Sequence, residues 1–231
     1  MTTLISALDV PEMETALTMV DKFGEEVQWY KVGKQIFTKF GPEIVRSLKS
    51  RGKKVFLDLK FHDIPNTVAQ AIRSAASIGA DIVNVHASGG PAMLTAAAQA
   101  ARETGVTVIA VTVLTSLDEN ELRAIGLQAT PAEQVVRLAK LIKDCGLAGV
   151  VCSPKEITLV REACGRDFLT VVPGIRPAGA AAGDQKRIMP PAEAAMAGAD
   201  YFVVGRPILQ AEDPLGAARA VNAELAAALA S

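Results

Sequence analysis

A short stretch of the sequence places three charged residues where a buried strand would end. Residues 55–57 are apolar and β-prone, and Asp58, Lys60 and Asp63 follow them. Because strand side chains alternate, Asp58 and Lys60 are expected to point to the same side, while Asp63 lies in the loop beyond. Opposite charges at this spacing can hold each other in their ionised forms while remaining available to a ligand. The alternative is a structural ion pair that closes one end of a sheet, since an unpaired buried ion is costly.

Two further charged residues follow apolar runs of the same kind. Asp9 comes directly after residues 4–8, and Lys31 lies near the end of residues 27–32. If these strand ends meet, both residues extend the alternation of carboxylate and ammonium groups. A lysine that only extends to the rim of the sheet is the alternative for Lys31.

A glycine and two arginines follow the last two apolar runs, residues 169–172 and 201–204. Arg176 and Arg206 can each donate paired, charge-assisted hydrogen bonds to an anion, and Gly205 lets the backbone approach that anion closely. These residues predict a site for a phosphorylated small molecule. The alternative is that each arginine is simply solvated.

The remaining polar candidates are less specific. Thr115 could hydrogen-bond a heterocycle or cap the next helix. Asn84 and His86 could reach the interior, where a hydrogen-bonded core histidine is the favoured interpretation of His86. His62 adjoins Asp63, but neighbouring side chains on an extended segment diverge, which disfavours His62 as a general base.

Eight short runs rich in β-branched residues must position these side chains, and segments with helical periodicity separate them. The runs are residues 4–8, 27–32, 55–59, 82–85, 106–111, 149–152, 169–172 and 201–204. The helical segments include residues 11–23, 35–51, 65–78, 91–104, 131–145 and 214–230, and several stop at glycine: Gly52, Gly79, Gly105, Gly146 and Gly198. Eight β/α units within 231 residues predict an α/β fold, a (β/α)8 TIM barrel, with residues 1–231 as a single domain. An open, doubly wound sheet is the alternative.

A barrel would bring the polar residues together, because its parallel strands all end at one rim. The loops after the seventh and eighth strands are the recurrent phosphate site of this architecture, in agreement with the positions of Arg176 and Arg206. Residues 173–191 form the longest irregular segment and are expected to be a lid or a binding loop.

Composition disfavours several other classes of protein. The net charge is −1 without any basic run, so neither nucleic acid nor a membrane surface is an expected partner. The three cysteines lack the spacing of a metal site and are expected to be reduced core or near-core residues, and two histidines are too few for a multi-histidine metal site. With no signal-like leader and no run of about 18 apolar residues, the chain is expected to be cytoplasmic.

Seven motifs follow one another along the chain: Ala7-Leu8-Asp9, Tyr30-Lys31-Val32-Gly33, Asp58-Leu59-Lys60-Phe61-His62-Asp63-Ile64-Pro65-Asn66-Thr67, Leu114-Thr115-Ser116, Pro173-Gly174-Ile175-Arg176, Asp184-Gln185-Lys186-Arg187 and Val203-Val204-Gly205-Arg206-Pro207. In this order they closely resemble the bacterial type of orotidine 5′-phosphate decarboxylase. The Asp-x-Lys-x-x-Asp core is shared with related sugar-phosphate barrel enzymes. The Ile-Pro-Asn-Thr, Gly-Ile-Arg and Asp-Gln-Lys-Arg segments are much more selective.

The resemblance implies conversion of orotidine 5′-monophosphate to uridine 5′-monophosphate and carbon dioxide, the last step of de novo pyrimidine synthesis, without a metal or organic cofactor. It implies that Lys60 donates a proton to C6 and that Asp58 lies beside the departing carboxylate. It also implies a homodimer with shared active sites. The other implied site residues are Lys31 and Asp9 for the ribose and the charged array, Asp63 and Thr67 for the partner's site, Thr115 for the pyrimidine, and Arg176, Gln185, Gly205 and Arg206 for the phosphate.

Two alternative functions stay open. A Mg²⁺-dependent 3-hexulose-6-phosphate synthase, or a related sugar-phosphate lyase, shares the Asp-x-Lys-x-x-Asp core, although Ile64-Pro65 and Gln185 argue against it. The other alternative is a nucleotide-binding barrel without catalytic activity. It is disfavoured because all four charged positions of the array are intact.

Overall fold

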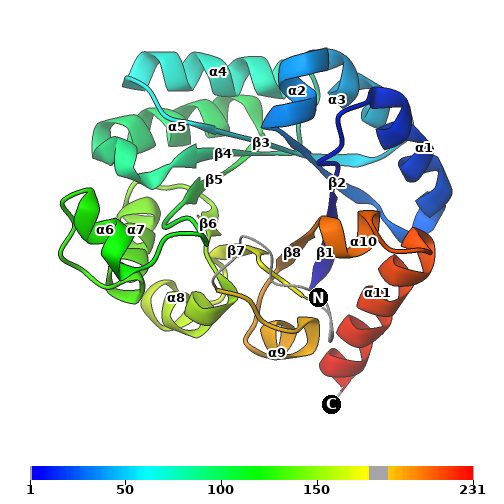
Figure 1. Cartoon of the computed structure of the whole chain (residues 1–231). Coiled ribbons are helices and arrows are strands. Elements are labelled where there is room, and N and C mark those ends of the chain that lie inside the picture. Colours follow the sequence, from blue (N-terminus) through cyan, green and yellow to red (C-terminus); the bar gives the residue numbers. More distant parts are fainter. Residues whose placement is uncertain (1, 177–186, 231) are drawn as a thin grey trace.

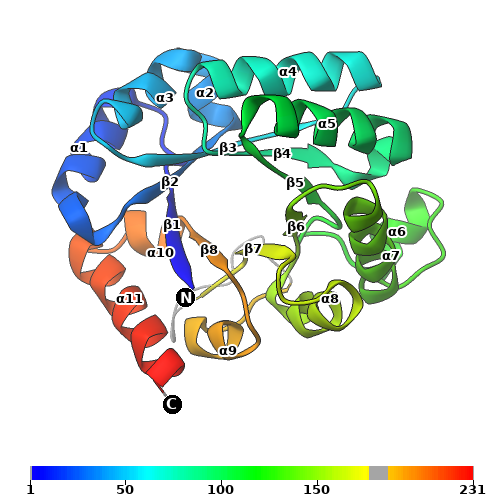
Figure 2. The ribbon, with the colours of Figure 1, turned by 180° about the vertical axis from the view of Figure 1, so that it is seen from behind.

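The structure, a computed structural model, describes residues 2–176 and 187–230. These residues form eight parallel strands that close into a barrel, in which each strand pairs with the next along the chain and β8 pairs with β1. The helices surround the strands (Figure 1), and the view from behind in Figure 2 shows the same ring. The predicted (β/α)8 barrel is therefore confirmed, and the open-sheet alternative is wrong.

The strands and helices follow the predicted alternation. The strands are β1 Thr3–Ala7, β2 Trp29–Gly33, β3 Lys54–Phe61, β4 Ile82–His86, β5 Thr107–Val111, β6 Gly149–Val151, β7 Leu169–Pro173 and β8 Tyr201–Val204. The helices are α1 Met13–Phe23, α2 Lys34–Phe40, α3 Pro42–Lys49, α4 Pro65–Ser77, α5 Gly90–Thr104, α6 Glu119–Ala124, α7 Pro131–Asp144, α8 Ile157–Cys164, α9 Pro191–Met196, α10 Arg206–Leu209 and α11 Pro214–Ala230. Short 3₁₀ turns lie at Gly24–Glu26, Ala87–Gly89 and Pro154–Glu156. All five glycines predicted at helix ends have positive φ.

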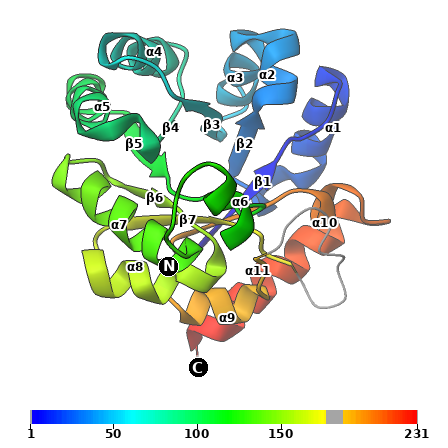
Figure 3. The ribbon, with the colours of Figure 1, turned by 60° about the vertical axis from the view of Figure 1, so that its left-hand side comes forward.

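The prediction that residues 35–51 form one continuous helix is wrong. The chain breaks this segment into α2 and α3 at Gly41, which has a φ of +57° and is followed by Pro42. Proline has no amide hydrogen to continue the helix, and it disfavours the helical conformation in the residue before it. The two short helices pack outside β2 and β3, as the turned view of Figure 3 shows.

The core has two parts, because the strands are buried on both faces. The larger part lies between the strands and the surrounding helices. The smaller part fills the interior of the barrel with side chains from six strands: Ile5, Ala7, Phe56, Ile82, Ile109, Val171 and Val203. Since apolar side chains fill the barrel interior, a ligand can enter only at the rim.

No helix in the described part of the chain combines the length and the apolar character needed to cross a membrane. All three cysteines are free, as predicted. Cys164 and Cys152 are buried and Cys145 is half-buried.

A hydrogen-bonded network joins α8 to the chain near the amino-terminal ends of β7 and β8. The Arg161 guanidinium of α8 forms an ion pair with Asp200 at 2.6 Å. It also donates hydrogen bonds to the carbonyl oxygens of Phe168, at 2.7 Å, and Gly198, at 3.0 Å. Asp200 in turn accepts hydrogen bonds from the amide and the hydroxyl of Thr170. The network therefore fastens α8 to both strands.

Arg161→Met is expected to lower the free energy of unfolding by about 2 kcal/mol, because the substitution leaves two carbonyl groups without their donor and Asp200 without its charged partner. Urea denaturation measures this change. Arg123→Met is the control, since Arg123 forms an exposed pair with Glu119 on α6 and its loss should change stability by less than about 0.5 kcal/mol. Equal effects of the two substitutions would contradict the assignment.

Candidate active site

A pocket of about 500 Å³ opens at the carboxyl ends of the strands. Eight of the residues predicted from sequence line it: Asp9, Lys31, Asp58, Lys60, Thr115, Arg176, Gly205 and Arg206. They come from the ends of β1, β2 and β3 and from the loops after β5, β7 and β8. The closed barrel thus brings together residues that lie as far as 197 positions apart in the sequence.

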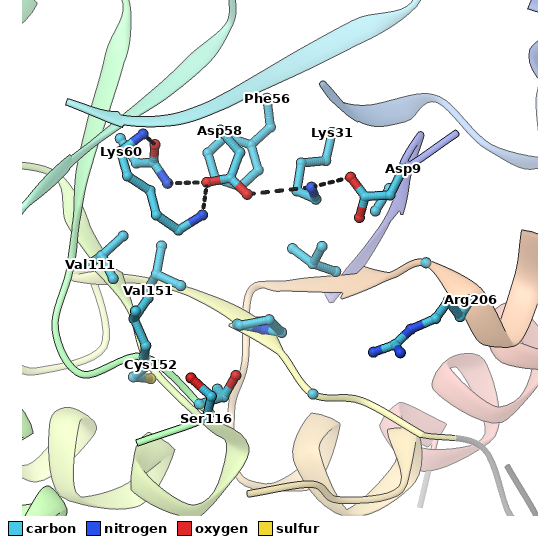
Figure 4. A pocket seen from close by; sticks show the side chains of 18 of the residues that line it. Asp9, Lys31, Phe56, Asp58, Lys60, Val111, Ser116, Val151, Cys152 and Arg206 are labelled. Carbon is cyan, nitrogen blue, oxygen red and sulfur yellow. Dashed lines mark hydrogen bonds and ion pairs between the residues drawn. The ribbon is translucent and has the colours of Figure 1, made fainter. Parts of the chain in front are cut away.

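Four of these side chains form a continuous row of alternating charge, which we call the charged row. The Lys31 ammonium lies 2.9 Å from Asp9 Oδ1 and 3.4 Å from Asp58 Oδ2. The other Asp58 oxygen, Oδ1, lies 2.5 Å from the Lys60 ammonium. Figure 4 shows the row running along one wall of the pocket from Asp9 to Lys60. Each lysine therefore has a carboxylate partner within the site.

The charged row keeps its inner members ionised. Burial alone would raise the pKa of the Asp58 carboxyl, but the charges of Lys31 and Lys60, together with hydrogen bonds from Lys60 and Asn84, outweigh burial and lower the pKa. Burial alone would lower the pKa of the Lys31 ammonium, yet Asp58 and Asp9 outweigh it and raise the pKa. Both shifts favour the charged form, so this part of the row stays alternately negative and positive at neutral pH.

Gly33, at the end of β2, leaves the space that the Asp9–Lys31 pair occupies. A Cβ atom at this position would lie 2.7 Å from Asp9 Oδ1 and 2.9 Å from Lys31 Nζ. The backbone register also places Gly33 beside Asp58 of the next strand. Any larger residue at position 33 would displace the charged row.

The end of β3 departs from a regular strand, so the prediction from simple alternation needs correction. Leu57 pairs with Val83 and Phe61 with Val85, so residues 58–60 of β3 lie opposite Asn84 alone. Lys60 has a φ of +55°, in the left-handed region. Asp58 and Lys60 do face the same pocket as predicted. They reach it through an irregular backbone, whereas period-two alternation assumed a regular one.

Three of the four residues that were predicted to bind a phosphate, Arg176, Gly205 and Arg206, line the same pocket. Arg176 is buried and donates a hydrogen bond from Nη1 to the Ile175 carbonyl oxygen at 2.9 Å. Gly205 and Arg206 follow β8, and Figure 4 shows Arg206 at the far side of the pocket from Lys60. Gln185 and most of the predicted lid, 177–186, lie outside the described residues.

Two other predicted site residues do not line the pocket of this chain. Asp63 and Thr67 are exposed, in the loop after β3 and the first turn of α4. Asp63 Oδ1 accepts a hydrogen bond from the amide of Ile64 at 2.7 Å. Ile64, at the same loop, exposes 68% of its surface.

The two histidines lie together outside the pocket lining, with their ring centroids 5.6 Å apart. His62 is exposed and His86 half-buried, so His86 is not the fully buried core residue that was predicted. Burial, followed by the nearby charges of His62, Lys60 and Lys34, lowers the pKa of His86 to about 4. The His86 imidazole is therefore neutral at neutral pH.

Sequence reasoning missed Arg187 as a structural part of the site. Its guanidinium forms a buried ion pair with Glu156 at 2.6 Å and donates hydrogen bonds to the carbonyl oxygens of Val113, at 3.0 Å, and Leu114, at 2.9 Å. Glu156 also accepts a hydrogen bond from Ser153. Arg187 thus links the loops after β5, β6 and β7. The spacing Ser-x-x-Glu at 153–156 predicts a capping box, but nothing in the sequence couples it to Arg187.

Asn84 and Cys152 also line the pocket, although neither was predicted as a site residue. Asn84 does reach the interior, as the sequence allowed. Burial raises the pKa of the Cys152 thiol, so the thiol is protonated at neutral pH. Within residues 2–176 and 187–230, no group of three or more His, Cys, Asp or Glu side chains is arranged to hold a metal ion.

These features define an enzyme of the (β/α)8-barrel class, with a charged pocket at the carboxyl ends of its strands. The family model described as "Orotidine 5′-phosphate decarboxylase / HUMPS family" matches residues 2–221. The chain belongs to this family, which confirms the resemblance carried by the seven motifs and the prediction of an enzyme.

Similar proteins of known name agree with this assignment. A protein from Moorella thermoacetica named orotidine 5′-phosphate decarboxylase is 52% identical, covering 96% of this chain and 91% of that protein. One of the same name from Vibrio campbellii is 51% identical, covering 96% and 97%. The crystal structure of orotidine 5′-phosphate decarboxylase from Lactobacillus acidophilus matches with a TM-score of 0.86 at 37% identity, covering 97% of this chain and 99% of that one.

Proposed function

We propose that the chain converts orotidine 5′-monophosphate to uridine 5′-monophosphate and carbon dioxide, in the last step of de novo pyrimidine synthesis. The observation that carries the proposal is the charged row, in which Asp58 lies between two lysines at the wall of the pocket. Arg206 lies across the pocket from Lys60, where it can meet a phosphate. Membership of the family supports the same reaction.

In this reaction the bond between C6 of the pyrimidine and the carboxylate carbon breaks, and its electron pair stays on C6. The resulting carbanion lies in the plane of the ring, where the π system cannot delocalise it, so a nearby cation must stabilise it. The Lys60 ammonium provides that charge and then transfers a proton to C6. The neutral amine regains a proton from water after product release.

Asp58 and Lys31 prepare Lys60 for this step. Asp58 accepts a short hydrogen bond from the Lys60 ammonium, 2.5 Å, which fixes the position of the proton donor before substrate binds. Asp58 faces the departing carboxylate, and loss of carbon dioxide relieves their repulsion. Lys31 and Asp9 hold the other end of the charged row and bind ribose hydroxyls.

Groups distant from C6 supply much of the binding energy. Thr115 contacts the pyrimidine, and the phosphate is held by Arg176, Gly205, Arg206 and Gln185, the last of which lies outside the described residues. Stabilising the transition state by on the order of 20 kcal/mol, near the upper end of the enzyme range, requires preorganised charges together with this remote binding. Binding energy from the phosphate accounts for the arginines at the end of the pocket opposite the charged row.

The proposal extends to the assembly and surroundings of the chain. The chain forms a homodimer with shared active sites, in which Asp63 and Thr67 reach the pocket of the partner. The exposure of Asp63, Thr67 and Ile64 in this chain supports that arrangement. From the sequence, we further propose that residues 1–231 form a single domain and that the enzyme is cytoplasmic and uses no cofactor.

The test is an ultraviolet assay of orotidine 5′-monophosphate in the presence of a chelator. Absorbance is expected to fall as uridine 5′-monophosphate forms, at the same rate with and without chelator, because Lys60 rather than a metal ion meets the developing charge. Product is identified by chromatography against authentic uridine 5′-monophosphate. A requirement for Mg²⁺ with a hexulose or pentulose phosphate as substrate would instead favour the sugar-phosphate lyase that shares the Asp-x-Lys-x-x-Asp core.

A further inference from the structure

The carboxyl end of β3 has a backbone conformation that its sequence does not favour. Among the residues that the structure describes, Lys60 is the only one other than glycine with a positive φ, +55°. The left-handed region is disfavoured for a residue that carries a Cβ atom, so neighbouring groups must hold Lys60 there. This residue carries the ammonium group to which the proposed reaction assigns the proton transfer.

Asn84 of β4 provides the contacts that hold it. Its Oδ1 atom accepts a hydrogen bond from the Lys60 amide at 2.8 Å, and its Nδ2 atom donates one to Asp58 Oδ1 at 2.7 Å. The regular ladder between β3 and β4 is interrupted at this point, because residues 58–60 lie opposite Asn84 alone. The Asn84 side chain therefore takes the place of a backbone partner for Lys60.

The same two bonds fix the geometry of the Asp58–Lys60 pair. Asp58 Oδ1 accepts a hydrogen bond from the Asn84 amide and another from the Lys60 ammonium. Asn84 therefore determines how the carboxylate is oriented toward the proton donor. Asn84 is 1% exposed, and both ends of its amide group are used. An apolar residue at this position could satisfy neither the Lys60 amide nor the carboxylate.

We propose that Asn84 is a positioning residue of this site, which sets the left-handed conformation of Lys60 and the orientation of Asp58 without contacting the reacting atoms. The inference rests on the proposed decarboxylation. It predicts that loss of Asn84 reduces the stabilisation of the transition state far more than the affinity for the product, since the product no longer carries a charge at C6.

The experiment compares Asn84→Ala with the wild-type enzyme and with Asn222→Ala. Asn222 is a matched control, because its Nδ2 atom also makes two hydrogen bonds, to the backbone and the side chain of Glu26, remote from the pocket lining. We measure kcat and KM for orotidine 5′-monophosphate. We also measure the affinity for uridine 5′-monophosphate and for an analogue of it that carries an ionised oxygen on C6.

For Asn84→Ala, kcat is expected to fall roughly 100-fold with little change in KM, as is typical when a supporting residue is lost from around a catalytic group. Affinity for the C6-anionic analogue should fall by a similar factor, while affinity for uridine 5′-monophosphate is retained. Asn222→Ala should leave all of these values unchanged. A kcat within twofold of wild type, or equal losses of affinity for the two ligands, would overturn the assignment.

Asn84→Asp is the second test variant if Asn84→Ala does not fold, because the aspartate side chain has the same shape as asparagine. It can still accept the hydrogen bond from the Lys60 amide, but it replaces the donor to Asp58 with a like charge, so kcat should fall at least as far. Wild-type kcat in folded Asn84→Asp would contradict the proposal. The wild-type rate by itself tests the decarboxylation, whereas the ratios of variant to wild type test Asn84.

Discussion

Lys60→Ala is expected to bind uridine 5′-monophosphate with nearly wild-type affinity and to lose decarboxylation by at least about 10⁴-fold. In the proposed mechanism, the substitution removes both the cation that faces the C6 carbanion and the proton that quenches it, and each effect is typically worth two or more powers of ten. Binding should persist because Arg176, Gly205 and Arg206, the residues that we propose to hold the phosphate, are unchanged. Lys31 still neutralises Asp58 in the variant, at 3.4 Å, so the site should remain folded.

The measurement combines single-turnover decarboxylation with equilibrium binding of the product. Lys54→Ala is the matched control, since Lys54 begins the same strand at its opposite end and pairs with Asp81. Its turnover should equal that of the wild type. Near-normal turnover by Lys60→Ala would exclude Lys60 as the acid and with it the proposed mechanism.

Asp63→Ala is expected to abolish most activity when both subunits carry it, and mixing it with Lys60→Ala subunits should restore about a quarter of the wild-type activity. In a homodimer with shared sites, a heterodimer of the two variants has one site with an intact Lys60 from one subunit and an intact Asp63 from the other. Random reassociation makes half of the dimers mixed, and each of these has one working site of two. The exposure of Asp63 outside the pocket of its own chain is the structural basis for this expectation.

Differently tagged subunits, refolded together and purified by both tags in turn, isolate the heterodimer and raise the expected activity to about half of the wild-type value. Asp63→Ala mixed with itself is the control for reassociation. A confirmed heterodimer with no more activity than the parent variants would show that Asp63 does not serve the neighbouring site.

The strand ends were the most predictable part of this protein. Asp9, Lys31 and Asp58 each follow an apolar run, and a closed parallel barrel has a single rim at which such ends must meet. The sequence therefore predicted both the fold and the charged residues that line the pocket. It failed for the helix at residues 35–51, where Gly41 and Pro42 outweigh the apolar periodicity.

Contacts between distant side chains could not be predicted in the same way. Arg187 lies 31 residues from Glu156 and more than 70 from the carbonyl groups it binds, and no local pattern relates them. The left-handed conformation of Lys60 is likewise set by Asn84, which belongs to another strand. Both features depend on tertiary contacts, which periodicity and motif spacing do not encode.

The charged row also determines the distance over which the site can act. Its two carboxylates and two ammonium groups sum to zero net charge and alternate in sign, so their combined field falls off faster with distance than the field of a single charge. The row therefore attracts a distant nucleotide, or any other anion in solution, less than an unpaired lysine would. Its strongest effects are on atoms already in contact with it, so in the proposed reaction the row acts mainly on a bound substrate, and bulk salt screens that action little.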